Sequence, residues 1–120
     1  MKTIGIVGTR RKNEIWHYRK VEQEFLKCYE EGDVICSGLC PKGADKFALH
    51  LSKVYNTKTL WFPADWKKYG KAAGFKRNTD IAFKSDILIA LVSDDRTGGT
   101  EDTIKKFLAF NPKKELIVLL

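Results

Sequence analysis

Apolar and polar residues follow two different rhythms along this chain, and the two rhythms alternate from one end to the other. Five short runs are largely apolar, which is typical of buried strands; they cover residues 2–7, 33–37, 58–62, 86–92 and 115–120. The stretches between them space apolar residues by three and four, which predicts helices with one buried face; these cover residues 16–31, 44–54, 75–84 and 100–110. The first helix is expected to bury Tyr18, Val21, Phe25, Leu26 and Tyr29.

The ends of these elements carry their own signals. Asn13 is a predicted helix N-cap, Gly32 fits the stop of the first helix, and Asn111–Pro112 is expected to end the last one. Residues 63–74 have no periodicity and are expected to be irregular.

Strict alternation of apolar strands and helices predicts a parallel sheet that is covered on both faces. Right-handed crossovers then give a three-layer, doubly wound, Rossmann-like α/β domain. We expect about five mainly parallel strands and about four helices, in a single domain over residues 1–120.

Composition places the chain among ordinary globular proteins, with 43% hydrophobic and 31% charged residues. No apolar run approaches the roughly 20 residues of a membrane span, and the start shows no signal peptide. Three cysteines do not make a disulfide framework, so we expect reduced thiols in a cytoplasmic protein. We expect no metal site, no membrane partner and no required cofactor. The net charge of +7 favours anionic partners, either nucleic acid or phosphate-bearing small molecules.

The strand-to-helix loops of such a sheet share one edge, where ligands bind. Four loops are therefore candidates: residues 8–13, 38–45, 63–78 and 93–100. Glycines allow close backbone approach, helix starts bind anions, and arginine binds phosphate in a bidentate manner. The predicted ligand-binding residues are Gly8, Thr9, Arg10, Gly38, Lys42, Gly43, Asp45, Asp65, Trp66, Tyr69, Lys71, Arg77, Asn78, Gly98, Gly99 and Thr100.

The third loop combines five basic residues with one acid and two interleaved aromatics, Trp66 and Tyr69. Such a stretch can stack a base and hold a phosphate. Arg77 and Asn78 are expected in the first turn of the helix that follows. The helix dipole does not favour a basic residue there, which points to a nearby anion. In the fourth loop, Glu101 and Asp102 suit the helix dipole but would repel a phosphate placed on that helix.

These loops resemble the YspA-like branch of the SLOG superfamily, named for the Smf/DNA-processing protein A and LOG proteins. The resemblance rests on Thr9–Arg10, on the stretch from Gly38 to Asp45, on residues 63–78 and on Gly99–Thr100. It covers nearly the whole chain and implies a Rossmann-like fold that binds nucleotides or nucleotide-derived molecules. It also implies a sensor or sequestering role, and a homodimer through helix faces. The LOG branch hydrolyses the N-glycosidic bond of nucleoside 5′-monophosphates with a glutamate three residues after its Gly-Thr pair, where this chain has Thr103.

Three functions therefore stand beside one another. The first is binding of a nucleotide-like, phosphate-bearing molecule without strong catalysis. The second is N-glycosidic hydrolysis of nucleotides, which needs a carboxylate near the anomeric carbon; its candidates are Asp45, Glu101 and Asp102. The third is nucleic-acid binding related to that of DNA-processing proteins, which the positive charge and the aromatic-basic loop favour.

Overall fold

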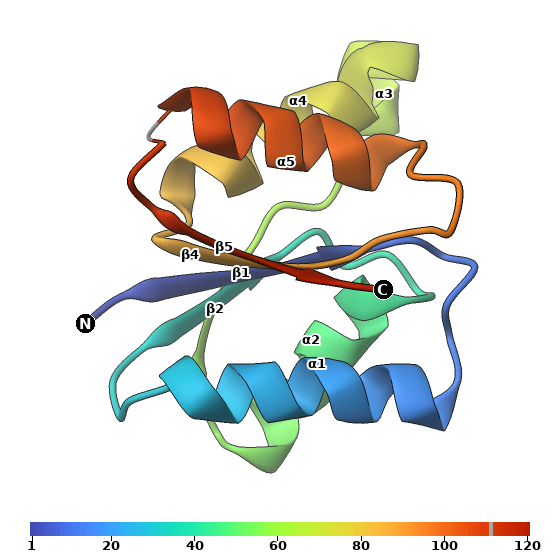
Figure 1. Ribbon diagram of the computed structural model, residues 1–120. Helices are drawn as coiled ribbons and strands as arrows, with labels where there is room; N and C mark the ends of the chain where they lie inside the picture. Colours follow the sequence, from blue (N-terminus) through green and yellow to red (C-terminus); the bar gives the residue numbers. More distant parts are fainter. Residues whose placement is uncertain (111) are drawn as a thin grey trace.

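The computed structural model describes residues 1–110 and 112–120, and five parallel strands form its centre (Figure 1). The strands are β1 (Thr3–Gly8), β2 (Val34–Ser37), β3 (Lys58–Trp61), β4 (Ile87–Leu91) and β5 (Glu115–Leu119). They lie side by side in the order β3-β2-β1-β4-β5, and every neighbouring pair is parallel. This is the predicted Rossmann-like architecture.

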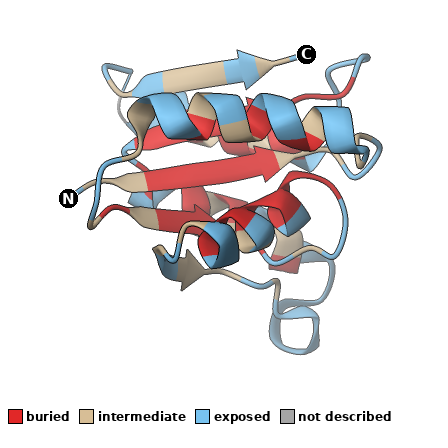
Figure 2. Ribbon diagram, turned by 90° about the horizontal axis from the view of Figure 1, so that it is seen from below, coloured by how far each residue is buried: buried red, intermediate tan, exposed pale blue. Residues whose placement is uncertain are grey.

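Long helices cover both faces of the sheet (Figure 1). They are α1 (Ile15–Cys28), α2 (Ala44–Val54), α4 (Ala73–Lys84) and α5 (Gly99–Phe110). Helices α1 and α2 cover one face, and α4 and α5 cover the other (Figure 1). Figure 2 shows the result of this layering, with the central strands buried and the outward helix faces exposed.

Each face of the sheet has its own apolar core because successive strand residues point to opposite sides. In β1, Ile4 and Ile6 pack towards α1 and α2, whereas Val7 belongs to the cluster beneath α4 and α5. In β4, Ile89 likewise faces α1 and α2 while Leu88 faces α4 and α5. The central strands are therefore covered on both sides, as their continuous apolar sequences predicted.

The first helix differs from its prediction at both ends. Glu14, not Asn13, is its N-cap, in a capping box that it shares with His17. The helix ends at Cys28, so Gly32, with a φ of +93°, lies in the turn that leads to β2. Tyr18, Val21 and Phe25 are buried as expected, but Leu26 is 48% exposed because it lies beside the buried face.

The segment expected to be irregular contains a short helix, α3 (Trp66–Tyr69), and a 3₁₀ turn, η1 (Gly70–Ala72). Helix α4 follows at once and begins at Ala73, which places Arg77 and Asn78 in its second turn and not in its first. The helix-dipole argument for an anion at these two residues therefore fails. The predicted helix break at residues 111–112 includes residue 111, which lies outside the described residues.

None of the helices in the described residues has the length and apolar character that a membrane span requires.

Candidate functional site

The strand order reverses direction between β1 and β4, since β2 and β3 lie on one side of this pair and β5 on the other. Crossover helices leave the two strands towards opposite faces, which opens a crevice at the carboxyl edge of such sheets. A cavity of about 330 Å³ lies there. It is lined by Val7, Gly8, Thr9, Arg10, Arg11, Cys40, Asp45, Arg77, Asn78, Ile81, Thr97, Gly98, Gly99, Thr100 and Thr103.

One wall of the cavity is built by close contact between the end of β1 and the start of α2. A Cβ atom on Gly8 would lie 2.6 Å from the Cβ of Ala44, so only glycine lets the helix approach this closely. Gly43 has a φ of +74° and lies against the carbonyl of Thr9. Its N–H donates to Asn13 Oδ1 at 2.9 Å, which gives Asn13 the function of joining two loops.

Asp45 is the carboxylate of the site and is almost fully buried. Its Oδ1 accepts from the Ser37 hydroxyl at 3.1 Å, and its Oδ2 accepts from the Cys40 N–H at 3.0 Å. The nearest guanidinium nitrogen of Arg77 lies 3.8 Å from Oδ2, which is an ion pair with loose geometry. Burial raises the pKa of Asp45 because these contacts only partly replace water around its charge.

Arg77 is held across the cavity by groups other than Asp45. Its Nε donates to Asn78 Oδ1 at 3.0 Å, and its Nη1 donates to the Gly38 carbonyl at 3.3 Å. The amide nitrogen of Asn78 in turn donates to the Gly99 carbonyl and to Asp102, both at 3.2 Å. Asn78 therefore joins α4 to the first turn of α5 and fixes the guanidinium of Arg77.

The start of α5 lines the cavity through Gly99 and Thr100, and the first N–H groups of a helix have no partner within it. Gly98 precedes it with a φ of +98°. Thr100 lines the cavity, and its hydroxyl makes no hydrogen bond to another group of the described residues. Thr57 Oγ1 is the buried side-chain polar atom that lacks a partner in the described part of the chain, so the Thr100 hydroxyl is instead open to the cavity and available for a ligand there.

The two acids of that turn are engaged elsewhere. Glu101 forms an ion pair with Arg96, with 2.9 Å between Glu101 Oε1 and Arg96 Nη2. Asp102 forms an ion pair with Lys106, with 2.9 Å between Asp102 Oδ2 and Lys106 Nζ. Neither acid lines the cavity. The repulsion of a phosphate expected from the sequence is therefore reduced by two neighbouring cations.

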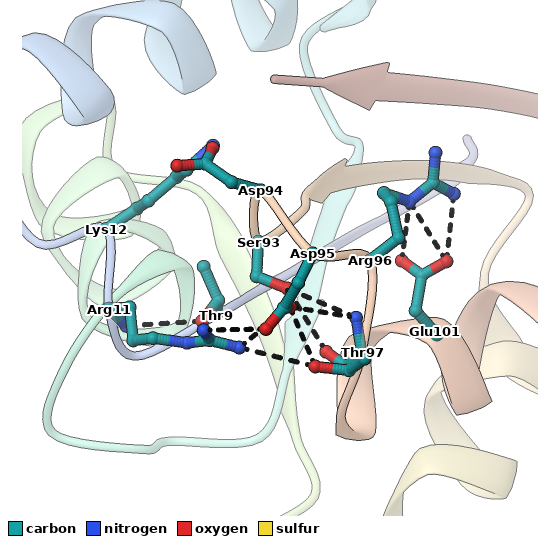
Figure 3. Close-up of polar contacts among 9 residues, drawn as sticks. All are labelled: Thr9, Arg11, Lys12, Ser93, Asp94, Asp95, Arg96, Thr97 and Glu101. Carbon is teal, nitrogen blue, oxygen red and sulfur yellow. Dashed lines mark hydrogen bonds and ion pairs between the residues drawn. The ribbon is translucent and has the colours of Figure 1, made fainter.

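Ion pairs also join the loop after β1 to the loop after β4 (Figure 3). Arg11 donates from both terminal nitrogens to Asp95 at 3.1 Å, and Lys12 lies 3.0 Å from Asp94. Asp95 also accepts from the hydroxyls of Ser93 and Thr97, and together with the Arg11 contact these bonds lower its pKa far below its usual value. The two loops that border the cavity thus hold one another in place.

The structure brings nine of the predicted ligand-binding residues to one cavity: Gly8, Thr9, Arg10, Asp45, Arg77, Asn78, Gly98, Gly99 and Thr100. Gly38 and Gly43 support its walls from behind, whereas other predicted residues do not line it; these are Lys42, Asp65, Trp66, Tyr69 and Lys71. Among the three carboxylate candidates for catalysis, only Asp45 lines the cavity.

Sequence reasoning left out six residues of the lining: Val7, Arg11, Cys40, Ile81, Thr97 and Thr103. Arg11 and Thr97 lie inside loops that the sequence analysis singled out, so their position next to predicted site residues is the signal that could have identified them. Thr103 donates to the Gly99 carbonyl at 3.1 Å, which indicates a structural role in the first turn of α5. Among the described residues, no group of three histidine, cysteine, aspartate or glutamate side chains is placed to hold a metal ion.

A second, more open groove of about 680 Å³ lies on the outer surface between α1 and α2. Its carboxylate Glu22 already accepts hydrogen bonds from Tyr18, Tyr55 and Arg19, so this acid is satisfied within the protein. The smaller cavity at the strand ends is the better functional candidate, because it lies at the switch in strand order and is lined by Arg10 and Thr100, whose side chains make no hydrogen bond within the described residues.

Comparisons of the chain with protein-family models, with curated proteins and with solved structures find no match.

Proposed function

We propose that the protein binds a nucleotide or a nucleotide-derived molecule through its phosphate group in the cavity between β1 and β4. The supporting observation is the partnerless hydroxyl of Thr100 at the start of α5, facing the same cavity as Arg10. Arg10 makes no hydrogen bond or ion pair within the described part of the chain, so its charge is available for an anion. Membership in the SLOG superfamily stays a prediction from the sequence and agrees with this proposal.

The size of the cavity suits a small ligand. Its volume of about 330 Å³ falls near the lower end of the range for small-molecule sites, about 300–1,000 Å³. The phosphate oxygens would accept hydrogen bonds from the N–H groups at the start of α5, from the Thr100 hydroxyl and from the Arg10 guanidinium. Asp45 would accept hydrogen bonds from the hydroxyls of an attached sugar.

Calorimetric titration tests the proposal with AMP, NAD, ADP-ribose and a cyclic nucleotide, and adenosine serves as the control without phosphate. We expect at least one phosphate compound to bind and adenosine to bind far more weakly. Thr100→Val keeps the shape of the side chain and removes the hydroxyl, and it should weaken binding about tenfold, as one charge-assisted hydrogen bond predicts. Lys42→Gln, at an exposed position outside the lining, is the matched control and should bind normally.

No binding of any of the four compounds at millimolar concentration would refute the proposal. Equal binding of AMP and adenosine would show that the phosphate is not what the site recognises.

N-glycosidic hydrolysis is the second candidate, and the position of Asp45 favours it. This carboxyl lines the cavity and has a raised pKa caused by burial, which is how enzymes keep a general acid protonated. Chromatography should then detect free adenine released from AMP. Asp45→Asn should abolish that release and leave AMP binding within a few-fold, whereas Glu101→Gln should change neither. Complete inertness towards nucleoside monophosphates would leave binding as the function.

A further inference from the structure

The chain has a second basic surface that the cavity does not use, and we call it the α3 surface. It is formed by Trp66, Lys67, Lys68, Tyr69, Lys71 and Lys76, which come from α3, η1 and the start of α4. In Figure 1, α3 projects from the body of the molecule beside α4. All six residues are exposed, and none of them lines the cavity between β1 and β4.

The positive charge of the α3 surface is not neutralised by the protein. Its four lysines form no ion pair within the described residues. Asp65 is the one acid between residues 65 and 76, and it serves as the N-cap of α3 by accepting from the Lys68 N–H. These twelve residues therefore carry +3 of the chain's total charge of +7, in one compact projection.

Two aromatic side chains lie among these lysines without being buried. Trp66 is 56% exposed, and one edge of its ring system lies against Gly74. Tyr69 is 36% exposed, and the ammonium groups of Lys68 and Lys76 each lie 5.2 Å from the centre of its ring. No cation or aromatic ring contacts Trp66 within the described residues, so its exposed face is available to a partner, and the two ammonium groups place positive charge beside the ring of Tyr69.

Exposed rings among unpaired cations match the chemistry of one class of partner. Proteins that bind single-stranded nucleic acid combine cations along the backbone with aromatic faces on which bases stack. A duplex hides its base faces, and a helix of four residues is too short to read a groove. An acidic peptide would satisfy the lysines but offers no flat rings to Trp66 and Tyr69.

We propose that the α3 surface binds single-stranded nucleic acid, with the lysines on the phosphates and Trp66 and Tyr69 against the bases. This site is separate from the cavity between β1 and β4. It does not depend on the function proposed for that cavity.

Fluorescence anisotropy of a labelled oligothymidylate of about 12 nucleotides tests the proposal, since OB-fold domains that bind single strands cover about 4–16 nucleotides. The test variant replaces Lys67, Lys68, Lys71 and Lys76 by glutamine. The matched control replaces Lys20, Lys27, Lys46 and Lys53 on α1 and α2 by glutamine, so the total charge falls equally on the opposite face of the sheet. We expect the test variant to lose at least tenfold in affinity. The slope of log affinity against log salt concentration should become less steep by about 3, because each of four lost phosphate contacts contributes about 0.7.

The aromatic contribution is tested separately. Trp66→Ala should weaken binding about tenfold, and Trp66→Phe should stay within about threefold of the wild type, because phenylalanine also stacks. The oligonucleotide should quench tryptophan fluorescence in the wild type. This quenching should be absent in Trp66→Phe, which would assign it to the ring of Trp66.

Four results would overturn the proposal. They are equal losses in the two lysine variants, unchanged binding by Trp66→Ala, equal affinity for polyglutamate of the same charge, and loss of oligonucleotide binding on Arg10→Gln. The last result would place the oligonucleotide in the cavity. Failure of nucleotide binding in the cavity would leave this proposal intact, because the two sites share no residue.

Discussion

Two buried aspartates show how the same residue type serves opposite purposes at the two edges of the sheet. Asp33, before β2, accepts from the N–H groups of Lys2 and Glu30 and from the Lys2 ammonium at 2.6 Å. Burial opposes the ionisation of Asp33, but these bonds outweigh burial and lower its pKa. At Asp45 burial prevails and raises the pKa. Asp33 is therefore satisfied by the fold, whereas Asp45 keeps capacity for a ligand.

Replacing Asp33 by asparagine should destabilise the protein at neutral pH by about 2 kcal/mol, because the charged acceptor of three hydrogen bonds is lost. The lowered pKa means that this stabilisation is present above the unfolded-state value and is lost as the pH falls through the folded-state value. Urea unfolding of the wild type and the variant at pH 7 and pH 3 measures both the loss of stability and its dependence on pH. Lys27→Ala, which removes an exposed ion pair with Glu24, should cost no more than about 0.5 kcal/mol. A similar cost for the two variants would contradict the role assigned to Asp33.

Asp45→Asn should change stability with the opposite pH dependence. Below the ordinary aspartate pKa of 3.8 the wild-type carboxyl is protonated in both states, and burial carries no penalty. As the pH rises through the window between 3.8 and the raised folded-state value, the wild type should lose stability relative to the variant. The quantity to measure is the difference between their unfolding free energies at several pH values. A difference that does not vary with pH would show that the pKa of Asp45 is not raised.

At the level of single residues, the sequence predicted much of the cavity because loop position after a parallel strand limits where a side chain can lie. Trp66 and Tyr69, whose loop was expected to reach the ligand, do not line this cavity. The loop forms α3 instead, and no pattern in the sequence indicates in which direction a helix of four residues projects.

The secondary-structure elements differ in how well their sequences predict them. Helix α2 was predicted with its bounds of Ala44–Val54, since Gly43 and the apolar spacing mark both its start and its buried face. Helix α4 begins at Ala73, two residues before its predicted start, so Gly74, which was assigned to the irregular segment, lies inside the helix. Short helices such as α3 complete only one turn, which is too little for apolar periodicity to show.

Gly74→Ala should stabilise the protein by about 0.5–1 kcal/mol, because alanine favours the helix and its Cβ would meet only Trp66, at 3.5 Å. Gly43→Ala has the same chemistry but should destabilise by about 1–3 kcal/mol, since its positive φ and its contact with Thr9 exclude a Cβ. Thermal unfolding of the two variants separates these effects. Stabilisation by both would mean that the loop at Gly43 can relax.

On the scale of the whole molecule, the cavity joins elements from both faces of the sheet. Its lining comes from the loop after β1, the start of α2, the second turn of α4 and the start of α5. The alternation of strands and helices predicted the sheet and its edge. The contact between Asn78 and Gly99 could not be predicted, because it depends on how α4 and α5 pack on each other.

A ligand that bridges these elements should stabilise the fold as a unit. At a concentration of one hundred times its dissociation constant it should add about 2.7 kcal/mol. For a domain of 120 residues that corresponds to a rise in melting temperature of about 11 °C. Differential scanning calorimetry with and without the ligand measures the shift. Asn78→Ala should reduce it by separating Arg77 from α5, whereas Lys53→Gln on the opposite face should not.

The parallel order of the strands also determines what can be attached to this protein without obstructing it. Met1 precedes β1 at the amino edge of the sheet, and Leu120 follows β5 at the carboxyl edge, where the cavity opens (Figure 1). A tether, label or fused domain joined at Met1 would leave the cavity facing solution. The same attachment at Leu120 would start from the edge that a ligand must approach, so immobilisation for binding measurements belongs at Met1.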